Sequence, residues 1–307
     1  MGCRTSPYLQ EKLALLGSLT VYQQVPVLVK NLLNLVVNQA QVYRVCQKLG
    51  QALPADQLAT PSPTLVQQQT QPQGVLYGMV DGSMIFTDSG WQEAKLGRVF
   101  AALPQADGSL QAATATSEYV AHRGHYGGFT PNFERLLPPQ SAAQKVFVTD
   151  GAEWIGNWLA TTYPAATHIL DYFHVVEKLA LAVKGSPTAK KWLTTQQEHL
   201  LANQSERVEN NVAKLKHLSA DEAVKLVGYL QNNRHRMRYE DYQKRGLMIG
   251  SGPIEAAHRT VLQVRMKRSG QRGVDIGCDN MVRLRVAHKS GKFALVTDLL
   301  KTTQTKV

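Results

Sequence analysis

The first part of the chain has the apolar periodicity of helices. Between residues 7 and 53, leucine and valine recur every three to four positions, a spacing that places them on one face of a helix. Val25 to Val37 predicts one such helix, and Gln39 to Gly50, preceded by Asn38, predicts another with a polar face and a terminal glycine. Residues 54–73, where Pro, Gln, Ser and Thr dominate, predict a linker without regular structure.

From Val75 the pattern changes to short apolar runs that are typical of strands. Val75 to Val80 ends at Asp81-Gly82-Ser83, and Met84 to Phe86 continues the strand past an expected bulge or turn. Two further strands are expected over residues 91–102 and 110–120, joined by a turn over residues 106–109. Pro131 then opens a helix.

Two acidic residues follow directly on strands in the middle of the chain. Val146 to Val148 predicts a buried strand that stops before Asp150, and His168 to Leu170 predicts a second strand that stops before Asp171. Helical spacing follows each aspartate, so the unit is βαβ-like and carries both acids at one edge of the sheet. For either aspartate alone, capping of the next helix explains the position equally well.

Three consecutive strands, a helix and then strand, helix, strand is the element order of an RNase H-like fold. In that order the ends of the first and fourth strands are neighbours, so Asp81 and Asp150 are expected to face each other. We therefore predict an α/β protein with an RNase H-like core. Its predicted parts are a helical, helix-turn-helix-like segment over residues 1–53, the linker over 54–73, the first part of the core over 74–184, a helical insertion over 185–246, and a return to the core over 247–307.

A third acid follows the insertion at the start of a predicted helix. Ser251 or Gly252 can cap this helix, and Pro253 suits its first turn, where the helix dipole favours a carboxylate such as that of Glu255. A salt-bridged helix start is the alternative role for this glutamate. The basic residues that follow it are Arg259, Arg265, Lys267, Arg268 and Arg272.

The formal net charge of +11 favours a polyanionic partner, because each neutralised phosphate releases counterions. We expect contacts with double-stranded DNA from the basic residues after Glu255 and from the polar-faced helix, although a plain three-helix packing module is an equal alternative for residues 7–53. On that helix the expected DNA contacts are Gln41, Arg44 and Lys48. The three cysteines are far apart and no apolar run is long enough for a membrane span, so we expect a cytoplasmic protein without a membrane partner.

Together, Asp81, Asp150 and Glu255 predict a carboxylate cluster whose mutual repulsion divalent cations would relieve. Two Mg²⁺ (or Mn²⁺) ions about 3.5–4 Å apart would activate a water or a 3′-hydroxyl and stabilise the leaving oxygen of a phosphodiester. Asp171 and His174 are expected near the same edge, with His174 contacting the scissile phosphate or a flipped base and Asp171 orienting it. Helix capping with a satisfied histidine is the alternative for this pair.

Several motifs in combination resemble a known family. They are TSPYLQEKLALLGS and NQAQVYRVCQKLG near the start, then VDGSM, VTDGAEWIGNWL, LDYFHVVEKL and GSGPIEAAHRTVLQVRMKRSGQR. The chain resembles bacterial insertion-sequence DDE transposases, of the ISKra class. This resemblance implies an RNase H-like catalytic core with a helical insertion before the last acid. It also implies metal-dependent DNA cleavage and strand transfer at the ends of the element, by a homo-oligomer on DNA in the cytoplasm, associated with the nucleoid.

The resemblance also assigns roles to single residues. Asp81, Asp150 and Glu255 match the catalytic, metal-binding triad of the family, and Asp171 with His174 matches a D-x-x-H signature. Two features depart from the pattern: glycine stands at position 273, where an aromatic residue is expected, and the chain begins near the family's first helices without a Cys-rich leader.

Two other functions compete with that of a transposase. A decayed, non-catalytic transposase-derived DNA-binding protein is the alternative. A haloacid-dehalogenase-type phosphatase is disfavoured, because it needs an aspartate two positions before Asp81, where Met79 stands.

Overall fold

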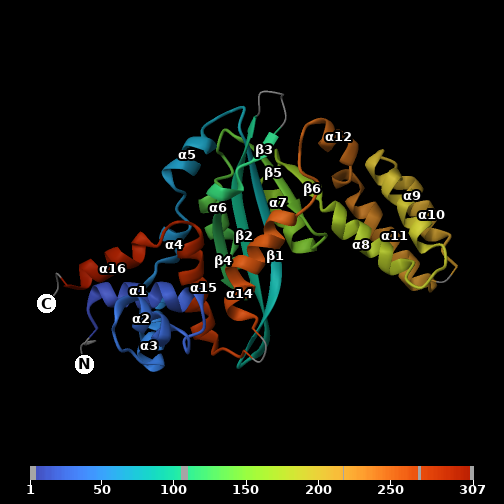
Figure 1. Cartoon of the computed structure of the whole chain (residues 1–307). Coiled ribbons are helices and arrows are strands. Elements are labelled where there is room, and N and C mark those ends of the chain that lie inside the picture. The colour runs from blue at the N-terminus through green and yellow to red at the C-terminus, as the bar shows by residue number, and fades with distance from the viewer. Residues whose placement is uncertain (1–4, 105–109, 217, 269–270, 305–307) are drawn as a thin grey trace.

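A mixed β-sheet lies at the centre of the computed structural model, which describes residues 5–104, 110–216, 218–268 and 271–304 (Figure 1). The strands are β1 (Val75–Thr87), β2 (Gly90–Pro104), β3 (Leu110–Ala112), β4 (Glu118–Arg123), β5 (Gln144–Thr149) and β6 (Thr167–Leu170). β1 pairs antiparallel with β2 and parallel with β5, β2 also pairs antiparallel with β3 and β4, and β6 is parallel to β5. The chain is therefore of the α/β class, as the sequence predicts.

Both faces of the sheet are buried, each in its own hydrophobic cluster. Side chains alternate along a strand, so Tyr77 and Met79 of β1 join one cluster while Leu76 and Val80 join the other. Helices α6 (Thr130–Leu136) and α7 (Glu153–Thr162) cover the face of Leu76 and Val80. The opposite face is covered by helices from both ends of the chain and by the start of α8 (Tyr172–Ala182).

The strands differ from the sequence prediction in two places. β1 is continuous through Asp81 and keeps an unbroken register with β2 as far as Thr87, so the expected bulge or turn is absent from this part of the chain. The strand expected over residues 110–120 is divided by a short 3₁₀ turn, Thr114–Thr116, into β3 and β4. The turn expected over residues 106–109 lies outside the described residues.

The first three helices share a core with the last two. In Figure 1, α1 (Pro7–Leu19), α2 (Val25–Leu33) and α3 (Gln39–Ala52) lie beside α15 (Asp275–Lys289) and α16 (Ala294–Gln304), on one side of the molecule. Asn38, which the sequence places before this helix, caps α3, because its side chain accepts a hydrogen bond from the backbone N–H of Gln41 at 2.8 Å. The helix expected over Val25 to Val37 instead stops at Leu33, where Asn34 adopts a left-handed conformation.

Gly50 does not end α3, contrary to the prediction. The helix continues to Ala52, and a Cβ at Gly50 would lie 2.4 Å from the carbonyl oxygen of Asn280 in α15. The glycine is therefore needed for the close approach of two helices. Its partner is 230 positions away (280 − 50), which is why local sequence reasoning placed it at a helix end.

Residues 54–73 are not an irregular linker, which corrects the prediction. They contain the short helices α4 (Ala55–Leu58) and α5 (Pro63–Gln69), and the side chain of Ser62 caps α5. Leu65 is buried, and the Gln69 side-chain amide donates to the Leu136 carbonyl oxygen at 2.7 Å. One buried leucine and one buried amide thus dock this polar segment, and its composition gave no sign of either contact.

The insertion is helical, as predicted, in the residues that the structure describes. Its helices extend from the sheet on the side opposite the N-terminal helices (Figure 1). The Tyr239 hydroxyl donates to the Leu170 carbonyl oxygen at 3.0 Å and joins the insertion to β6. Among the described helices, none is both long and apolar enough to cross a bilayer. The elements of the insertion are α9 (Ala189–Leu201), α10 (Ser205–Ala213), α11 (Ala220–Asn233), the 3₁₀ turn η3 (Arg234–Arg236) and α12 (Tyr239–Lys244).

After the insertion the chain returns to the sheet through α13 (Gly252–Ala257). Pro253 lies in the first turn of this helix, as predicted, but the Ser251 side chain makes no capping hydrogen bond and donates to Asp171 instead. A π-helical segment, His258–Gln263, and the short α14 (Val264–Met266) continue it. π-Helical turns are frequent at functional sites, so the neighbourhood of α13 is a natural place to look for one.

Candidate active site

Asp81 and Asp150 lie at the same level of two neighbouring strands. The last parallel pair between β1 and β5 joins Met79 to Val148, and each aspartate is two residues further along its strand, so both continue the same face of the sheet. Asp81 remains in β1, which runs on beside β2, whereas Asp150 follows the end of β5. The two aspartates are thus neighbours at the point where β5 ends while β1 continues.

Burial and charge distinguish the two carboxylates. The pKa of Asp150 is raised, first by burial and further by the charge of Asp81, while a hydrogen bond from the Ala152 N–H at 3.1 Å opposes the rise. Asp81 accepts a hydrogen bond from the Gly82 N–H at 2.7 Å. The negative charge of Asp81 therefore repels that of Asp150, and a bound cation would relieve this repulsion.

Asp171 is fully buried and saturated with hydrogen bonds. One oxygen accepts from the Phe173 N–H at 2.7 Å and thereby caps α8. The other accepts from the Ser251 N–H at 3.2 Å and from the Ser251 hydroxyl, and lies 3.0 Å from His174 Nδ1. Burial alone would raise the pKa of Asp171, but these hydrogen bonds lower it. Asp171 thus both caps the helix and orients His174.

His174 is a cation at neutral pH in this arrangement. The hydrogen bond with Asp171 raises its pKa to about 9, against the effect of burial, and the charges of Asp150 and Asp81 contribute to the rise. Because Nδ1 is held by Asp171, Nε2 is the ring atom that can donate to a ligand. The structure therefore places a positively charged donor near the two aspartates.

Glu255 lies on the same side of the sheet but is not gathered with the aspartates. α13 packs against β1 and β2 through Ile254 and Ala257, and Arg98 of β2 donates to the Pro253 carbonyl oxygen at 2.5 Å. The Glu255 side chain is 46% exposed and lies 3.8 Å from Arg259 Nη2. Within the described parts of the chain, no three His, Cys, Asp or Glu side chains are close enough together to hold a metal ion.

His258 is a residue of this site that the sequence analysis missed. It is 4% exposed, and its Nε2 lies 3.2 Å from an Asp81 carboxylate oxygen, an approach too poorly aligned to count as a hydrogen bond. The available signal was its position three residues after Glu255, one helical turn further on. The start of the π-helical segment at His258 was not visible in the sequence.

The expected DNA-contacting residues fall into two groups in space. Arg44 and Lys48 of α3 are exposed, as are Arg259, Lys267, Arg268 and Arg272, whereas Gln41 is half-buried and donates to the Thr5 hydroxyl at 2.8 Å. A groove of about 650 Å³ joins the two regions, with Gln39, Tyr43 and Gln47 on one side and Arg268 and Arg272 on the other.

Arg265 is an exception, which corrects its assignment as a phosphate contact. It is only 4% exposed, donates from Nε to the Gly17 carbonyl oxygen at 2.9 Å, and stacks its guanidinium over the Tyr22 ring. Burial lowers its pKa. Arg265 thus fastens the basic segment to the N-terminal helices and is not available to DNA in this conformation.

Comparison of the sequence with protein-family models, and separately with curated proteins, gave no match.

Proposed function

We propose that the chain is a DNA transposase of the DDE type, with an RNase H-like core that performs metal-dependent phosphodiester cleavage and strand transfer at insertion-sequence ends. The observation that carries the proposal is the pairing of Asp81 with Asp150 at one level of β1 and β5. The strand order β3-β2-β1-β5-β6, with β4 also paired to β2 and with β5 and β6 parallel to β1, supports the RNase H-like part of the proposal. The net charge of +11 favours DNA as the substrate.

The donor set fits a hard divalent cation. Carboxylate oxygens are the ligands that Mg²⁺ and Mn²⁺ prefer, and Asp81 and Asp150 would supply them. Glu255 would complete the set by turning its side chain inward and giving up its exposed ion pair with Arg259. Two such ions, when bound, activate the attacking oxygen and stabilise the leaving one.

The other residues of the site would position the DNA strand. His174, held by Asp171 and positively charged, would donate from Nε2 to a phosphate oxygen next to the scissile bond. His258 would orient the carboxylate of Asp81. Both histidines act through contacts with acids or phosphate, since imidazole is a weaker ligand for Mg²⁺ than a carboxylate.

A metal titration tests the proposal. Mg²⁺ or Mn²⁺ should raise the melting temperature, because a ligand that binds only the folded state stabilises it. Asp150→Asn should remove this shift, and so should Asp81→Asn. Glu153→Gln is the matched control, because Glu153 is an exposed acid three positions after Asp150. The same metal response in the parent and in Asp150→Asn would disprove the assignment.

A decayed DNA-binding protein is the second candidate, and the position of Glu255 outside a metal-binding group favours it. A cleavage assay distinguishes the two. The parent should nick a supercoiled plasmid that carries the element's own ends, and Asp150→Asn should not. DNA binding without cleavage by the parent would favour the decayed protein.

A further inference from the structure

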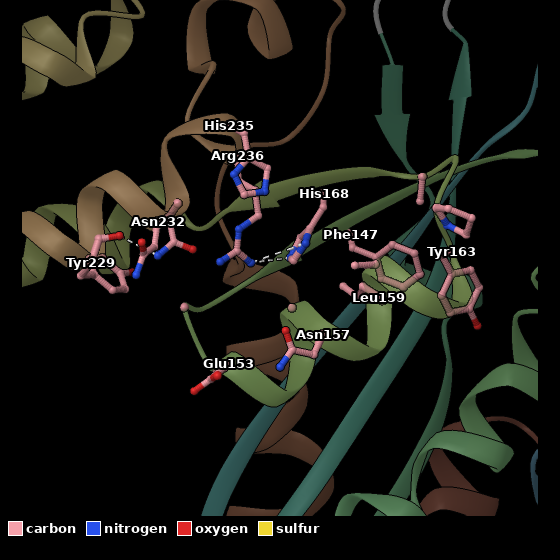
Figure 2. A pocket seen from close by; sticks show the side chains of 16 residues that line it. Phe147, Glu153, Asn157, Leu159, Tyr163, His168, Tyr229, Asn232, His235 and Arg236 are labelled. Carbon is pink, nitrogen blue, oxygen red and sulfur yellow. Dashed lines mark hydrogen bonds between the residues drawn. The ribbon is translucent and has the colours of Figure 1, made fainter.

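A cavity of about 670 Å³ opens between α7 and the end of α11, beside the carboxyl end of β5. Figure 2 shows Asn157 of α7 on one wall, His168 of β6 at the back, and Tyr229, Asn232 and Arg236 of the insertion on the other wall. The cavity therefore lies where the helical insertion meets the sheet, next to the strand that ends at Asp150.

The cavity contains a buried cation that forms no ion pair with a carboxylate of the described residues. Arg236 is 7% exposed, and its Nη1 lies 3.1 Å from His168 Nε2. Burial, and next the charge of Arg236, lower the pKa of His168 to about 3, so its ring is neutral. Arg236 Nε is buried without a hydrogen-bond partner, and no described carboxylate forms an ion pair with this guanidinium. A buried charge without an ion pair is costly, and an anion in the cavity would reduce that cost.

Two further polar atoms of the lining are buried without partners. They are the Tyr229 hydroxyl, which can donate, and Asn233 Oδ1, which can accept. The Asn233 amide nitrogen is already used, because it donates to the Tyr229 carbonyl oxygen at 2.7 Å. Lys178 places its ammonium group 4.8 Å from the centre of the Tyr229 ring and adds positive charge. Two donor atoms without partners in the residues that line the cavity favour an anionic ligand such as a phosphate group.

The cavity is also close to the aspartate pair. A Cβ at Gly151 would lie 2.3 Å from the Tyr229 ring, so this ring packs directly on the residue after Asp150. The charge of Asp150 also acts on Arg236. A strand held at Asp150 would thus pass the mouth of the cavity. Glu153 lines the rim as well and is the acidic side chain that a bound phosphate would approach.

We propose that this cavity, the Arg236 pocket, binds a phosphate group of a nucleotide, with Arg236 as its cation and Tyr229 as a second donor. A guanidinium suits phosphate because it is permanently charged and donates charge-assisted hydrogen bonds. The phosphate comes either from the DNA strand beside the scissile bond or from a free nucleotide. The first source rests on the proposed function, whereas binding of phosphate itself does not.

Inorganic phosphate, titrated by calorimetry at constant ionic strength without divalent metal, tests the pocket. The parent should bind it, and Arg236→Gln should weaken binding by about tenfold or more, as expected for a lost charge-assisted hydrogen bond. Arg238→Gln is the matched control, because this side chain is 66% exposed and pairs with Asp241 outside the cavity. No binding by the parent, or equal affinity in Arg236→Gln, would overturn the proposal.

Tyr229→Phe keeps the test decisive if Arg236→Gln does not fold, because it removes only the hydroxyl and keeps the ring on Gly151. Phosphate binding should weaken about fivefold, the range for a neutral hydrogen bond. If Tyr229→Phe binds phosphate as tightly as the parent, Tyr229 has no role in binding. If in addition Arg236→Gln does not fold, that result would overturn the pocket itself.

One comparison distinguishes the two sources of the phosphate, and a second distinguishes the Arg236 pocket from the proposed function. If the phosphate belongs to a DNA strand, a 5′-phosphorylated tetranucleotide should bind more tightly than a nucleoside monophosphate. Equal affinity would overturn the DNA strand as the source in favour of a free nucleotide. Asp150→Asn should lose the metal response but keep phosphate binding. A parent that binds phosphate without a metal response overturns the proposed function alone. A parent that responds to metal but does not bind phosphate overturns the pocket alone.

Discussion

The carboxylate of Asp171 has more partners than either aspartate of the proposed metal pair. It receives hydrogen bonds from α8, from His174 and from Ser251, so its negative charge is distributed over fixed donors. Such a carboxylate is a poor candidate for binding a cation and a good one for holding a histidine in one orientation. These contacts therefore suit Asp171 to positioning His174, whereas Asp81 and Asp150 are the acids of the proposed metal pair.

The His174–Asp171 pair predicts a pH dependence of stability. The pKa of His174 is about 9 in the folded protein and about 6.5 in an unfolded chain. Because the folded value is higher, the stabilisation is complete below pH 6.5 and is lost as the pH rises through 9. Between pH 6.5 and 9.5 the parent should lose about 1–3 kcal/mol that His174→Gln does not lose, a range reduced because the side chain is 34% exposed.

Urea unfolding of both proteins across that pH range measures this difference. Parallel stability profiles for the parent and His174→Gln would show that the pair is not linked to folding. In the plasmid assay at pH 7, His174→Ala should cleave more than about tenfold more slowly than the parent, as expected for the loss of a positioned catalytic group. An equal cleavage rate would leave the pair purely structural.

At the scale of elements, close packing of α3 on α15 depends on one missing side chain. Gly50→Ala would place a methyl group 2.4 Å from the Asn280 carbonyl oxygen, and relief requires the two helices to separate. We expect a loss of about 1–3 kcal/mol in the free energy of unfolding. Gly228→Ala in α11 is the matched control, because no atom lies within 4 Å of its Cβ position. There alanine should stabilise by up to about 1 kcal/mol, its advantage in helix propensity.

Chemical denaturation measures both glycine variants. A neutral Gly50→Ala would mean that the helices tolerate a wider separation than the structure shows. A destabilising Gly228→Ala would mean that α11 has packing partners at this position.

Most elements were predictable from the sequence because their signals are local. Periodicity located the α/β order, and the N-cap at Asn38 and the proline at Pro253 marked the starts of two helices. Properties that depend on distant partners were not predictable. Gly50 requires Asn280, and the burial of Arg265 requires Gly17 and Tyr22.

The residues of the candidate site likewise fall into those that a local pattern predicts and those that depend on distant partners. The placement of Asp81 beside Asp150 could be expected from pattern alone, since β1 and β5 are neighbours in the strand order. The contact of His258 with Asp81 could not, because it depends on how α13 crosses β1. The same holds for Arg236, whose burial depends on packing of the insertion against His168 of β6.

At the scale of the whole molecule, exposed positive charge is the feature that would bring DNA to the groove between α3 and the basic segment. Replacing Lys267 and Arg268 together with alanine should reduce the slope of log affinity against log salt by about 2, close to one unit for each phosphate contact. Lys190→Ala with Lys191→Ala is the matched control, because these exposed lysines lie on α9 in the insertion. Equal slopes for all three proteins would exclude the basic segment from the DNA interface.

Arg265→Ala should behave differently from the surface variants. Its loss removes a buried hydrogen bond to Gly17 and the contact with Tyr22, so the melting temperature should fall while the salt slope of the folded protein stays as in the parent. A flattened slope with unchanged stability would return Arg265 to the DNA interface.

The hydrogen bonds between Asp171 and Ser251 join residues that are 80 positions apart, so the insertion leaves and re-enters the core at one point. Lengthening such a closed segment is inexpensive, because each doubling of a loop costs only about 0.6 kcal/mol in closure entropy. The length of the insertion is therefore a nearly free variable. The loops between the helices of the insertion could therefore lengthen while Asp81 and Asp150 stay where they are.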